Sequence, residues 1–423
     1  MSGPLGEEQR ENRWSLPATG TVLIVGAGEA GVAAAAALRE GGFGGHVMLA
    51  TDEAGIPYER PPLSKQQLKS DDEPERLIRP AEWFAAERIE LIPNTCISEI
   101  DPAARRARLG DSGQVVSYDA LLLATGARAR RLQGDPAGVH YLRTREDAAR
   151  LRSALRAARS VVVLGGGVIG LEVASTAVEL GLDVTVIDPA PRLMHRAVAP
   201  EISALLADLH RAAGVTLVLE SGPIAVEADG RGGALVRVGE ATHSADVCVA
   251  GIGVIPNDDL ARAAGCAVDN GVVVDGCGRT SLERIYAAGD VASFHHPTYG
   301  HSLRVEAWQH AGRHGAHVAR SMLGIDDAYA EVPWFWTDQL ETNIQVAGLA
   351  ADCDQTVWRG TSISGTAFHF RNGVLRGVST VNNGRDIRPS SRLIASGWRG
   401  DSRLLTDPTR PLGKIASDLL VEF

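Results

Sequence analysis

The stretch Val22-Leu23-Ile24-Val25-Gly26-Ala27-Gly28-Glu29-Ala30-Gly31 decides the fold. Its first four residues form a short apolar run, typical of a buried parallel strand, and an alanine-rich helical segment follows at residues 32–39. In the loop between them, Gly26 permits a sharp turn, Gly28 lets a pyrophosphate approach the backbone, and Gly31 lets helix and strand pack closely. The free N–H groups that begin the helix face the phosphates. The segment therefore predicts a dinucleotide site.

A second copy of this pattern begins at residue 161. Residues 161–164 are an apolar run, residues 165–170 read Gly-Gly-Gly-Val-Ile-Gly, and residues 171–180 have helical character. One such glycine motif is weak evidence, but two copies in strand–loop–helix context are strong evidence for two dinucleotide sites. The sequence thus predicts an α/β protein with two Rossmann-like domains.

An acidic residue follows the second strand of each copy. Asp52 and Glu53 follow the predicted strand at residues 46–50, and the sequence leaves open which of them accepts hydrogen bonds from a ribose; Asp188 ends the corresponding later strand. A carboxylate there hydrogen-bonds a 2′-OH and repels a 2′-phosphate. Asp188 therefore predicts NADH rather than NADPH, a preference that Arg192 softens.

Three further apolar runs predict strands that end in glycine turns. They lie at residues 121–127, 247–255 and 285–291, and the last contains Gly289-Asp290. An acid at the end of a strand, just before a helix, suits a polyol hydroxyl; the alternative for Asp290 is an ordinary helix N-cap.

Composition narrows the class of protein. The chain has 423 residues, 44% of them hydrophobic, which is enough for two or three packed domains. The net charge of −10 argues against nucleic-acid binding. Five scattered cysteines without metal or disulfide spacing fit a reducing cytoplasm. We expect no membrane span, because glycines and Glu29 interrupt the apolar run at residues 21–38, and residues 1–20 lack the features of a signal peptide.

Motifs outside the loops resemble one family. Residues 57–65 read Pro-Tyr-Glu-Arg-Pro-Pro-Leu-Ser-Lys, residues 288–290 Ala-Gly-Asp, residues 305–308 Val-Glu-Ala-Trp, residues 332–339 Val-Pro-Trp-Phe-Trp-Thr-Asp-Gln and residues 381–386 Val-Asn-Asn-Gly-Arg-Asp. In this order they resemble the oxygenase-coupled NADH–ferredoxin reductases, flavoproteins of the putidaredoxin reductase and biphenyl dioxygenase ferredoxin reductase type. The resemblance covers nearly all of the chain after residue 20.

The resemblance implies an architecture and a reaction. It predicts an FAD-binding domain at residues 21–126 and 250–329, an NAD-binding domain at residues 127–249 and a C-terminal domain at residues 330–423, after a disordered extension at residues 1–20. Hydride passes from NADH to FAD N5, and two single electrons then pass to a [2Fe–2S] ferredoxin that feeds a Rieske dioxygenase or a cytochrome P450. The cofactors are FAD and NADH, and the protein is a monomer or homodimer.

The resemblance also implies site residues. Lys65 lies near flavin N5, paired with Glu172, which contacts the nicotinamide end of NADH; Trp308 and Trp336 line the flavin. The alternatives are a surface lysine, pairing of Glu172 with its helix dipole, and two core aromatics. Arg60 and Arg128 are loop cations near the FAD, or else surface arginines. The cofactor-binding set is Gly26, Gly28, Ala30, Gly31, Asp52, Arg60, Lys65, Thr125, Gly126, Arg128, Gly165, Gly167, Val168, Ile169, Gly170, Glu172, Asp188, Gly253, Asp290 and Trp308.

The cysteines set this chain apart from its dithiol relatives. Those enzymes need a Cys-x₄-Cys pair after the first β–α unit, whereas the first cysteine here is Cys96. Since thiol–disulfide exchange needs a thiolate beside the flavin, the sequence excludes disulfide reduction by that mechanism.

Histidines gather in a predicted helix at residues 305–323. His310, His314 and His317 share one helical face, which predicts an exposed face rather than a metal site. An acidic ferredoxin needs a positive patch on an acidic reductase, so we expect docking near Arg304, His310, Arg313 and His314, with His317 and Arg320 contributing.

Two rival functions keep the same fold. One changes the electron acceptor to rubredoxin, a quinone-like molecule or oxygen. The other is a redox-sensing flavoprotein that resembles apoptosis-inducing factor, in which slow reduction changes binding rather than supplying electrons.

Overall fold

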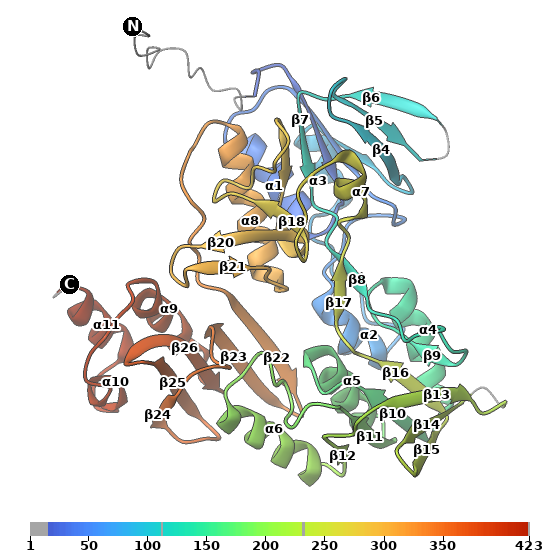
Figure 1. Ribbon diagram of the computed structural model, residues 1–423, viewed down its shortest axis with the longest axis vertical. Coiled ribbons are helices and arrows are strands. Elements are labelled where there is room, and N and C mark those ends of the chain that lie inside the picture. Colours follow the sequence, from blue (N-terminus) through green and yellow to red (C-terminus); the bar gives the residue numbers. More distant parts are fainter. Residues whose placement is uncertain (1–15, 111–112, 231–232, 422–423) are drawn as a thin grey trace, which may run out of the picture. The chain divides into compact units, whose positions relative to one another are not determined.

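The computed structural model describes residues 16–110, 113–230 and 233–421, and they fold into two compact units that alternate along the chain. The first unit comprises the residues up to Glu59, Arg76–Ala127 and Pro256–Glu331. The second comprises Arg60–Glu75, Arg128–Ile255 and Val332–Phe423. Figure 1 colours the chain from blue to red, so these alternations can be followed in it.

A five-stranded parallel sheet forms the centre of the first unit, in the order β19-β7-β1-β2-β3. Its strands are short and apolar because both faces are covered. They are β1 (Thr21–Val25), β2 (His46–Ala50), β3 (Ile89–Ile92), β7 (Ala120–Leu123) and β19 (Ile285–Ala287). The carboxyl ends of all five therefore meet at one edge of the sheet, where the first glycine loop leaves β1.

Two helices pack closely on one another in this unit. They are α1 (Glu29–Glu40) and α8 (Trp308–Met322). A Cβ atom on Gly315 of α8 would lie 2.1 Å from the Ala30 carbonyl oxygen of α1, so the two backbones approach in a way that only glycine permits. The sequence folds this way because α1 presents mainly alanine to its neighbours. The close approach fixes the start of α8 relative to the first glycine loop.

Smaller elements complete the first unit. β4, β5 and β6 form one antiparallel sheet, and β18, β20 and β21 form a mixed sheet. Their bounds, with those of the remaining helices, are α3 (Ala81–Ala86), β4 (Ile97–Asp101), β5 (Arg106–Leu109), β6 (Gln114–Ser117), α7 (Asp259–Ala264), β18 (Val272–Val274), η3 (Gly289–Val291), β20 (Ala292–His296) and β21 (His301–Leu303).

The second unit repeats the parallel sheet. Its order is β12-β11-β10-β16-β9, with β10 at the centre. The strands are β9 (Val139–His140), β10 (Ser160–Leu164), β11 (Asp183–Ile187), β12 (Thr216–Val218) and β16 (Val247–Ala250). The second glycine loop joins β10 to helix α5 (Val168–Glu179), as the first joins β1 to α1.

A five-stranded antiparallel sheet lies further along the second unit, in the order β22-β23-β26-β25-β24. It is built from β22 (Trp334–Gln339), β23 (Thr342–Gly348), β24 (Gln355–Gly360), β25 (Gly365–Arg371) and β26 (Val374–Val381). The other elements of this unit are η2 (Pro61–Ser64), α2 (Gln66–Lys69), α4 (Arg145–Ala157), α6 (Pro200–Ala212), β13 (Ile224–Ala228), β14 (Ala234–Val238), β15 (Ala241–Ala245), η4 (Gly384–Asp386), α9 (Ile387–Ala395), α10 (Arg403–Thr406) and α11 (Leu412–Val421).

The predicted α/β class is confirmed, while two predicted strands differ in detail. The apolar run at residues 247–255 is two strands, β16 and β17 (Val254–Pro256), and β17 pairs with β8 (Ala127–Ala129). The run at residues 285–291 stops at Ala287, and Asp290 lies in the short 3-10 helix η3, which leads into strand β20 and not into an α-helix. The glycine turn explains this, because Gly289 has a φ of 77°.

Two further expectations concern the ends of the chain and the membrane. Of the predicted disordered extension at residues 1–20, residues 1–15 lie outside the described residues, whereas residues 16–20 are placed and Leu16 packs against the core of the first unit, so the extension was predicted too long. The domain limits given above stay a prediction. Within the described part of the chain, no helix is both long enough and apolar enough to span a bilayer.

Candidate functional site

The first glycine loop has the geometry that its sequence predicts. Gly26 has a φ of 106°, and a Cβ there would lie 2.3 Å from the Ala124 carbonyl oxygen. A Cβ on Gly31 would lie 2.0 Å from the Gly26 carbonyl oxygen, whereas a Cβ on Gly28 would meet no atom within 4 Å. The space beside Gly28, at the start of α1, is a cradle for a pyrophosphate, so the residues fit a dinucleotide such as FAD.

The second glycine loop repeats this geometry. Gly165 has a φ of 104°, and a Cβ there would lie 2.4 Å from the Gly251 carbonyl oxygen. A Cβ on Gly170 would lie 2.0 Å from the Gly165 carbonyl oxygen, and Gly167 again faces open space. Val168 and Ile169 begin α5, and Ile169 is 41% exposed. The second unit thus carries its own cradle for a pyrophosphate.

The acids after the second strand of each copy are held in different ways. Asp188 accepts hydrogen bonds from the backbone N–H groups of Gly166 (2.5 Å) and Ala190 (2.7 Å), which fixes its carboxylate at the loop. In the first unit Asp52 is exposed, whereas Glu53 accepts a hydrogen bond of 2.5 Å from the Tyr58 hydroxyl. Of the two candidates that the sequence leaves open, Glu53 is the one held in place by a neighbouring side chain.

Two more turns gather at the carboxyl edge of the first sheet. Thr125 and Gly126 are locked to Asn257, whose side-chain amide donates to the Thr125 carbonyl oxygen at 2.9 Å and whose backbone N–H donates to the Gly126 carbonyl oxygen at 2.9 Å. A Cβ on Gly289 would lie 2.8 Å from the Ala30 Cβ, so Asp290 follows a turn that touches the start of α1. The strand ends that the sequence singles out in this unit therefore converge on the first glycine loop.

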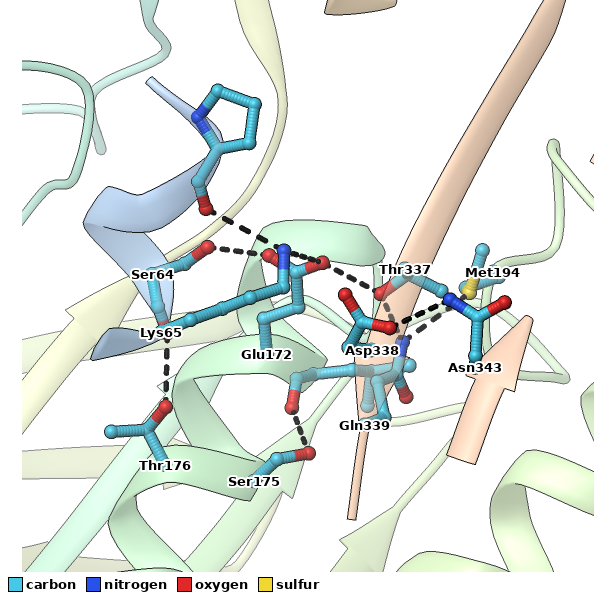
Figure 2. Close-up of polar contacts among 12 residues, drawn as sticks. Ser64, Lys65, Glu172, Ser175, Thr176, Met194, Thr337, Asp338, Gln339 and Asn343 are labelled. Carbon is cyan, nitrogen blue, oxygen red and sulfur yellow. Dashed lines mark hydrogen bonds and ion pairs between the residues drawn. The ribbon is translucent and has the colours of Figure 1, made fainter. Parts of the chain in front are cut away.

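A buried ion pair lies on the second glycine-loop helix. Glu172, in the first turns of α5, is 2% exposed, and the Lys65 Nζ lies 2.9 Å from its Oε1 atom. The Ser64 hydroxyl donates to the other oxygen, Oε2, and the Thr176 hydroxyl holds the Ser64 carbonyl oxygen at 3.0 Å. Figure 2 shows Lys65 and Ser64 converging on the carboxylate. Burying a charged carboxylate costs free energy unless it is paired and hydrogen-bonded, and Lys65 and Ser64 supply these contacts to Glu172.

The proline turn explains how Lys65 reaches this place. Pro61 and Pro62 begin the short 3-10 helix η2, and Lys65 follows it directly. Prolines fix φ and so set the direction in which the chain leaves the turn. The Lys65 ammonium also lies 3.5 Å from the Pro61 carbonyl oxygen, so the turn both aims and partly satisfies it.

Reasoning from sequence did not identify one direct partner of Glu172, Thr337, or the two residues connected to it by further hydrogen bonds, Gln339 and His210. The Thr337 hydroxyl donates to Glu172 Oε1 at 2.7 Å, the Gln339 amide donates to the Thr337 hydroxyl at 3.1 Å, and His210 Nε2 lies 3.0 Å from the Gln339 Oε1 atom. Thr337 and Gln339 alternate on β22, directly after the Pro-Trp-Phe-Trp motif. A threonine and a glutamine on one buried face of a strand were the available signal, because such positions are ordinarily apolar.

The remaining predicted residues lie on loops and element ends. The Arg60 guanidinium donates to the Arg143 carbonyl oxygen at 2.6 Å, and Arg128 is exposed on β8. The Arg130 N–H donates to the Gly253 carbonyl oxygen at 2.9 Å, which shapes the turn at Gly253. Trp336 stacks on Trp334 with ring centroids 5.6 Å apart. Their roles toward the cofactors stay predictions.

Glu29 is a further residue that the motif alone did not single out. It follows Gly28 in the first loop, and a Cβ on Gly312 of α8 would lie 2.8 Å from its Oε1 atom. Burial raises the pKa of Glu29 to about 7; the nearby Glu59 carboxylate raises it further, while Arg79 and a hydrogen bond with Trp308 oppose the rise. A carboxyl that accepts a proton near neutral pH can lie beside a phosphate-binding loop without repelling its ligand.

The histidine face of α8 is buried, so the predicted exposed face is wrong, and His310, His314 and His317 are too buried to offer a surface for docking; the docking of a ferredoxin near this helix stays a prediction. His310, His314 and His317 pack around Tyr329; His310 Nδ1 lies 3.1 Å from the Tyr329 hydroxyl, and the Gly289 N–H donates to His314 Nδ1. Burial lowers the pKa of His310 to about 4 and that of His314 well below its usual range, so both are neutral at pH 7.

The two arginines predicted beside these histidines are engaged with acids. Arg304 pairs with Glu306 at 2.6 Å, and Arg313 pairs with Glu331 at 2.6 Å. The N–H groups of Arg304 also bond the Asp290 carbonyl oxygen. Residues 16–110, 113–230 and 233–421 contain no cluster of three side chains suited to a metal ion.

Comparisons with known proteins agree with this geometry. Residues 20–315 match the pyridine nucleotide-disulphide oxidoreductase family, and residues 334–416 match the reductase C-terminal family. The chain is similar to the ferredoxin–NAD(+) reductase component of the anthranilate 1,2-dioxygenase system of Burkholderia cepacia, with 44% identity over 92% of this chain and 97% of that protein.

Two solved structures are similar over nearly the whole chain. A ferredoxin reductase from Rhodopseudomonas palustris has a TM-score of 0.88 and 38% identity, covering 94% of this chain and 100% of the other. Putidaredoxin reductase in its covalent complex with putidaredoxin has a TM-score of 0.89 and 35% identity, covering 96% of this chain and 100% of the other.

Proposed function

Because this chain belongs to the pyridine nucleotide-disulphide oxidoreductase family, we propose that it is the NADH-dependent, FAD-containing ferredoxin reductase of an oxygenase system. The observation that carries the proposal is the buried Lys65–Glu172 pair on the helix that follows the second glycine loop. A charge pair kept in the interior at a nucleotide-binding helix is placed to act on a bound nicotinamide rather than to stabilise the fold.

Each unit binds one dinucleotide in this proposal. In the first unit, the loop from Gly26 to Gly31 holds the FAD pyrophosphate, and Asp290 accepts a hydroxyl of the FAD ribityl chain. In the second unit, the loop from Gly165 to Gly170 holds the NADH pyrophosphate. When bound, the flavin supplies the conversion between a two-electron hydride donor and one-electron acceptors.

The polar side chains around each cradle orient the ligands. Glu172, held by Lys65 and Ser64, accepts a hydrogen bond from the nicotinamide carboxamide, whose amide group is a donor. In the first unit, the N-terminus of α8 at Trp308 favours negative charge on the reduced flavin through its dipole. Asp188, fixed by two backbone N–H groups, accepts a ribose hydroxyl and disfavours the additional phosphate of NADPH.

The electron acceptor is a [2Fe–2S] ferredoxin. The similar proteins named above are reductases of ferredoxins, and one of them is solved with putidaredoxin attached. They do not favour rubredoxin reduction or redox sensing as the function. The five cysteines are free thiols, which suits a reducing cytoplasm as the location of the protein.

Stopped-flow spectroscopy of the two half-reactions tests this proposal. The FAD-loaded protein is mixed with NADH, and the decrease in flavin absorbance is followed; the reduced protein is then mixed with an oxidised [2Fe–2S] ferredoxin, and cluster bleaching is followed. We expect both steps to be fast on the timescale of turnover. Rapid reduction by NADH followed by sluggish transfer to every ferredoxin offered, with a long-lived charge-transfer band, would instead support the sensor.

A further inference from the structure

Three side chains contact the carboxylate of Glu172, and one of them is itself hydrogen-bonded to further buried side chains. Lys65 and Ser64 approach from the segment that follows the proline turn, and Thr337 approaches from β22. Lys65 is the one charged group that contacts the carboxylate among these partners; Asp338, next along β22, instead accepts a hydrogen bond from the Asn343 side chain. Thr337 is therefore an uncharged partner, and its effect on Glu172 comes from the direction of its hydrogen bond and not from a charge.

The carboxylate dictates the direction of the hydrogen bonds behind it. An ionised carboxylate accepts only, so the single hydroxyl hydrogen of Thr337 is donated to Glu172. The Thr337 oxygen then accepts from the Gln339 amide nitrogen, and this orients the amide so that its oxygen faces His210. Since that oxygen can only accept, His210 carries its hydrogen on Nε2. The result is a chain of donors that runs from His210 through Gln339 and Thr337 to Glu172.

The surroundings favour this one orientation. Gln339 is 1% exposed, and its amide nitrogen lies 3.9 Å from the Met194 sulfur, which offers no donor to a flipped amide oxygen. His210, on α6, has no exposed surface, and burial lowers its pKa, which the hydrogen bond with Gln339 partly opposes. His210 is therefore neutral at pH 7, and its buried Nδ1 atom has no hydrogen-bond partner in the described chain. Figure 2 shows Thr337 and Gln339 reaching from β22 toward Glu172.

We propose that Thr337, Gln339 and His210 are positioning residues for the reduction by NADH, acting through the fixed direction of their hydrogen bonds on the Glu172 carboxylate. This inference rests on the role proposed above for Glu172. It makes the C-terminal sheet part of the nicotinamide site, because β22 supplies two members of the chain. A polar chain buried between α5, α6 and β22 specifies one arrangement of these groups, where apolar side chains would merely fill the space.

Four single variants of the FAD-loaded enzyme, and the double variant of Thr337→Val with Gln339→Met, test the proposal. Thr337→Val keeps the shape and removes the donor, Thr337→Ser restores the hydroxyl, and Gln339→Met replaces the amide with an apolar chain of similar length. Ser379→Ala is the matched control, because the Ser379 hydroxyl contacts His369 at 2.8 Å in the same sheet, also buried and far along the chain from Glu172. The readouts are the NAD(+) dissociation constant by calorimetry, the rate of flavin reduction by NADH, and ferredoxin reduction by enzyme reduced chemically beforehand.

The expected pattern is specific to a chain that acts through Glu172. Thr337→Val weakens NAD(+) binding and raises the KM for NADH about 5- to 10-fold, Gln339→Met about 3-fold, and Thr337→Ser and Ser379→Ala have little effect. In the Thr337→Val background, Gln339→Met adds nothing, because its route to Glu172 is already broken. Ferredoxin reduction by the pre-reduced enzyme does not change in any variant.

The possible outcomes distinguish a failure of the positioning role from a failure of the role proposed for Glu172. Additive effects of the two substitutions, no rescue by Thr337→Ser, or an equal effect of Ser379→Ala would overturn the positioning role. If Thr337→Val does not fold, Gln339→Met still decides, because it leaves the Thr337 hydroxyl in place. A Glu172→Gln enzyme with unchanged NAD(+) affinity would remove the proposed role of Glu172, whereas a weakened one beside unaffected chain variants would remove only the present inference.

Discussion

The two glycine loops have the same backbone and different side chains behind it. In both, the first glycine has a φ near 105°, the third would place a Cβ 2.0 Å from the carbonyl oxygen of the first, and the middle one faces open space. The helix after the first loop opens with Glu29, which has a raised pKa, while the helix after the second opens with Val168 and Ile169 and places Glu172 one turn further in.

The difference teaches which part of a dinucleotide site is generic. The backbone cradle is set by glycine sterics and serves any pyrophosphate, so it is the same in both units. The side chains decide what else the site does: Glu29, with its pKa raised to about 7, is about half protonated at pH 7, whereas Glu172 is surrounded by hydrogen-bond and ion-pair donors. Each prediction below changes one loop and leaves the other as an internal control.

The largest effect is expected from the third glycine of each loop. Gly31→Ala and Gly170→Ala each force a Cβ against a backbone carbonyl, so the loop must open. We expect Gly31→Ala to give protein with little bound FAD, and Gly170→Ala to retain FAD but lose reduction by NADH at least about 100-fold, about 2.7 kcal/mol. Flavin absorbance per protein and stopped-flow reduction measure the two losses. Equal FAD loss in both variants would contradict the assignment of one dinucleotide to each loop.

Removing the charge of Glu172 is expected to have the next largest effect. Glu172→Gln leaves the Lys65 ammonium buried without its carboxylate partner, and we expect the KM for NADH to rise about 10-fold, about 1.4 kcal/mol. Glu179→Gln is the control, since Glu179 lies on the same helix and forms an exposed ion pair with Lys69. Steady-state kinetics with NADH compare them. An unchanged KM in Glu172→Gln would exclude Glu172 from the site.

The choice of nicotinamide tests the acid of the second unit. Asp188→Asn keeps a side chain that can accept from one of the two backbone N–H groups, but it removes the negative charge. We expect the ratio of kcat/KM for NADPH to that for NADH to rise about 10-fold, because the repulsion of the 2′-phosphate is lost. The ratio is measured with both cofactors on one preparation. If the ratio of the two kcat/KM values does not change, a group other than Asp188 selects the cofactor.

The smallest effect is expected at Glu29 and concerns stability. Its pKa is raised from 4.5 to about 7, so the folded protein holds a proton that the unfolded chain releases, and the free energy of unfolding falls as pH rises from about 4.5 to about 7. Glu29→Gln does not titrate, so the free energy of unfolding of the variant rises relative to that of the wild type as the pH rises across that range. Because Glu29 is only half-buried, we expect about 1 kcal/mol. Thermal unfolding at pH 5 and pH 8 checks it, and an equal Tm difference at both values would refute it.

The sequence predicts the two glycine loops that form the pyrophosphate cradles, but it does not predict the side chains that contact Glu172. Short apolar runs and glycine spacing are local properties, and they place β1, α1, β10 and α5 almost at their observed bounds. The Lys65–Glu172 pair came from family resemblance, since no spacing rule joins residues so far apart. Thr337, Gln339 and His210 were invisible for the same reason: their contacts depend on how separate segments pack.

The histidines of α8 show the limit of periodicity. Spacing places His310, His314 and His317 on one face, but it does not say whether that face is covered. The small residues between them were the overlooked signal, because Ala311 and Gly315 allow neighbouring chain to approach closely. A face of imidazoles and small residues is therefore better read as core.

The alternation of the two units along the chain has a consequence for synthesis. The last residue of the first unit is Glu331, so every residue of that unit has been polymerised before β22 begins at Trp334. At on the order of 5–20 residues per second, Thr337 is added about 0.3 to 1.2 s after Glu331, and about 8 to 33 s after Glu172, which is made 165 residues earlier. The residues of the FAD cradle are therefore all synthesised before the Thr337 partner of Glu172, so the nicotinamide site is the later of the two to be completed along the chain.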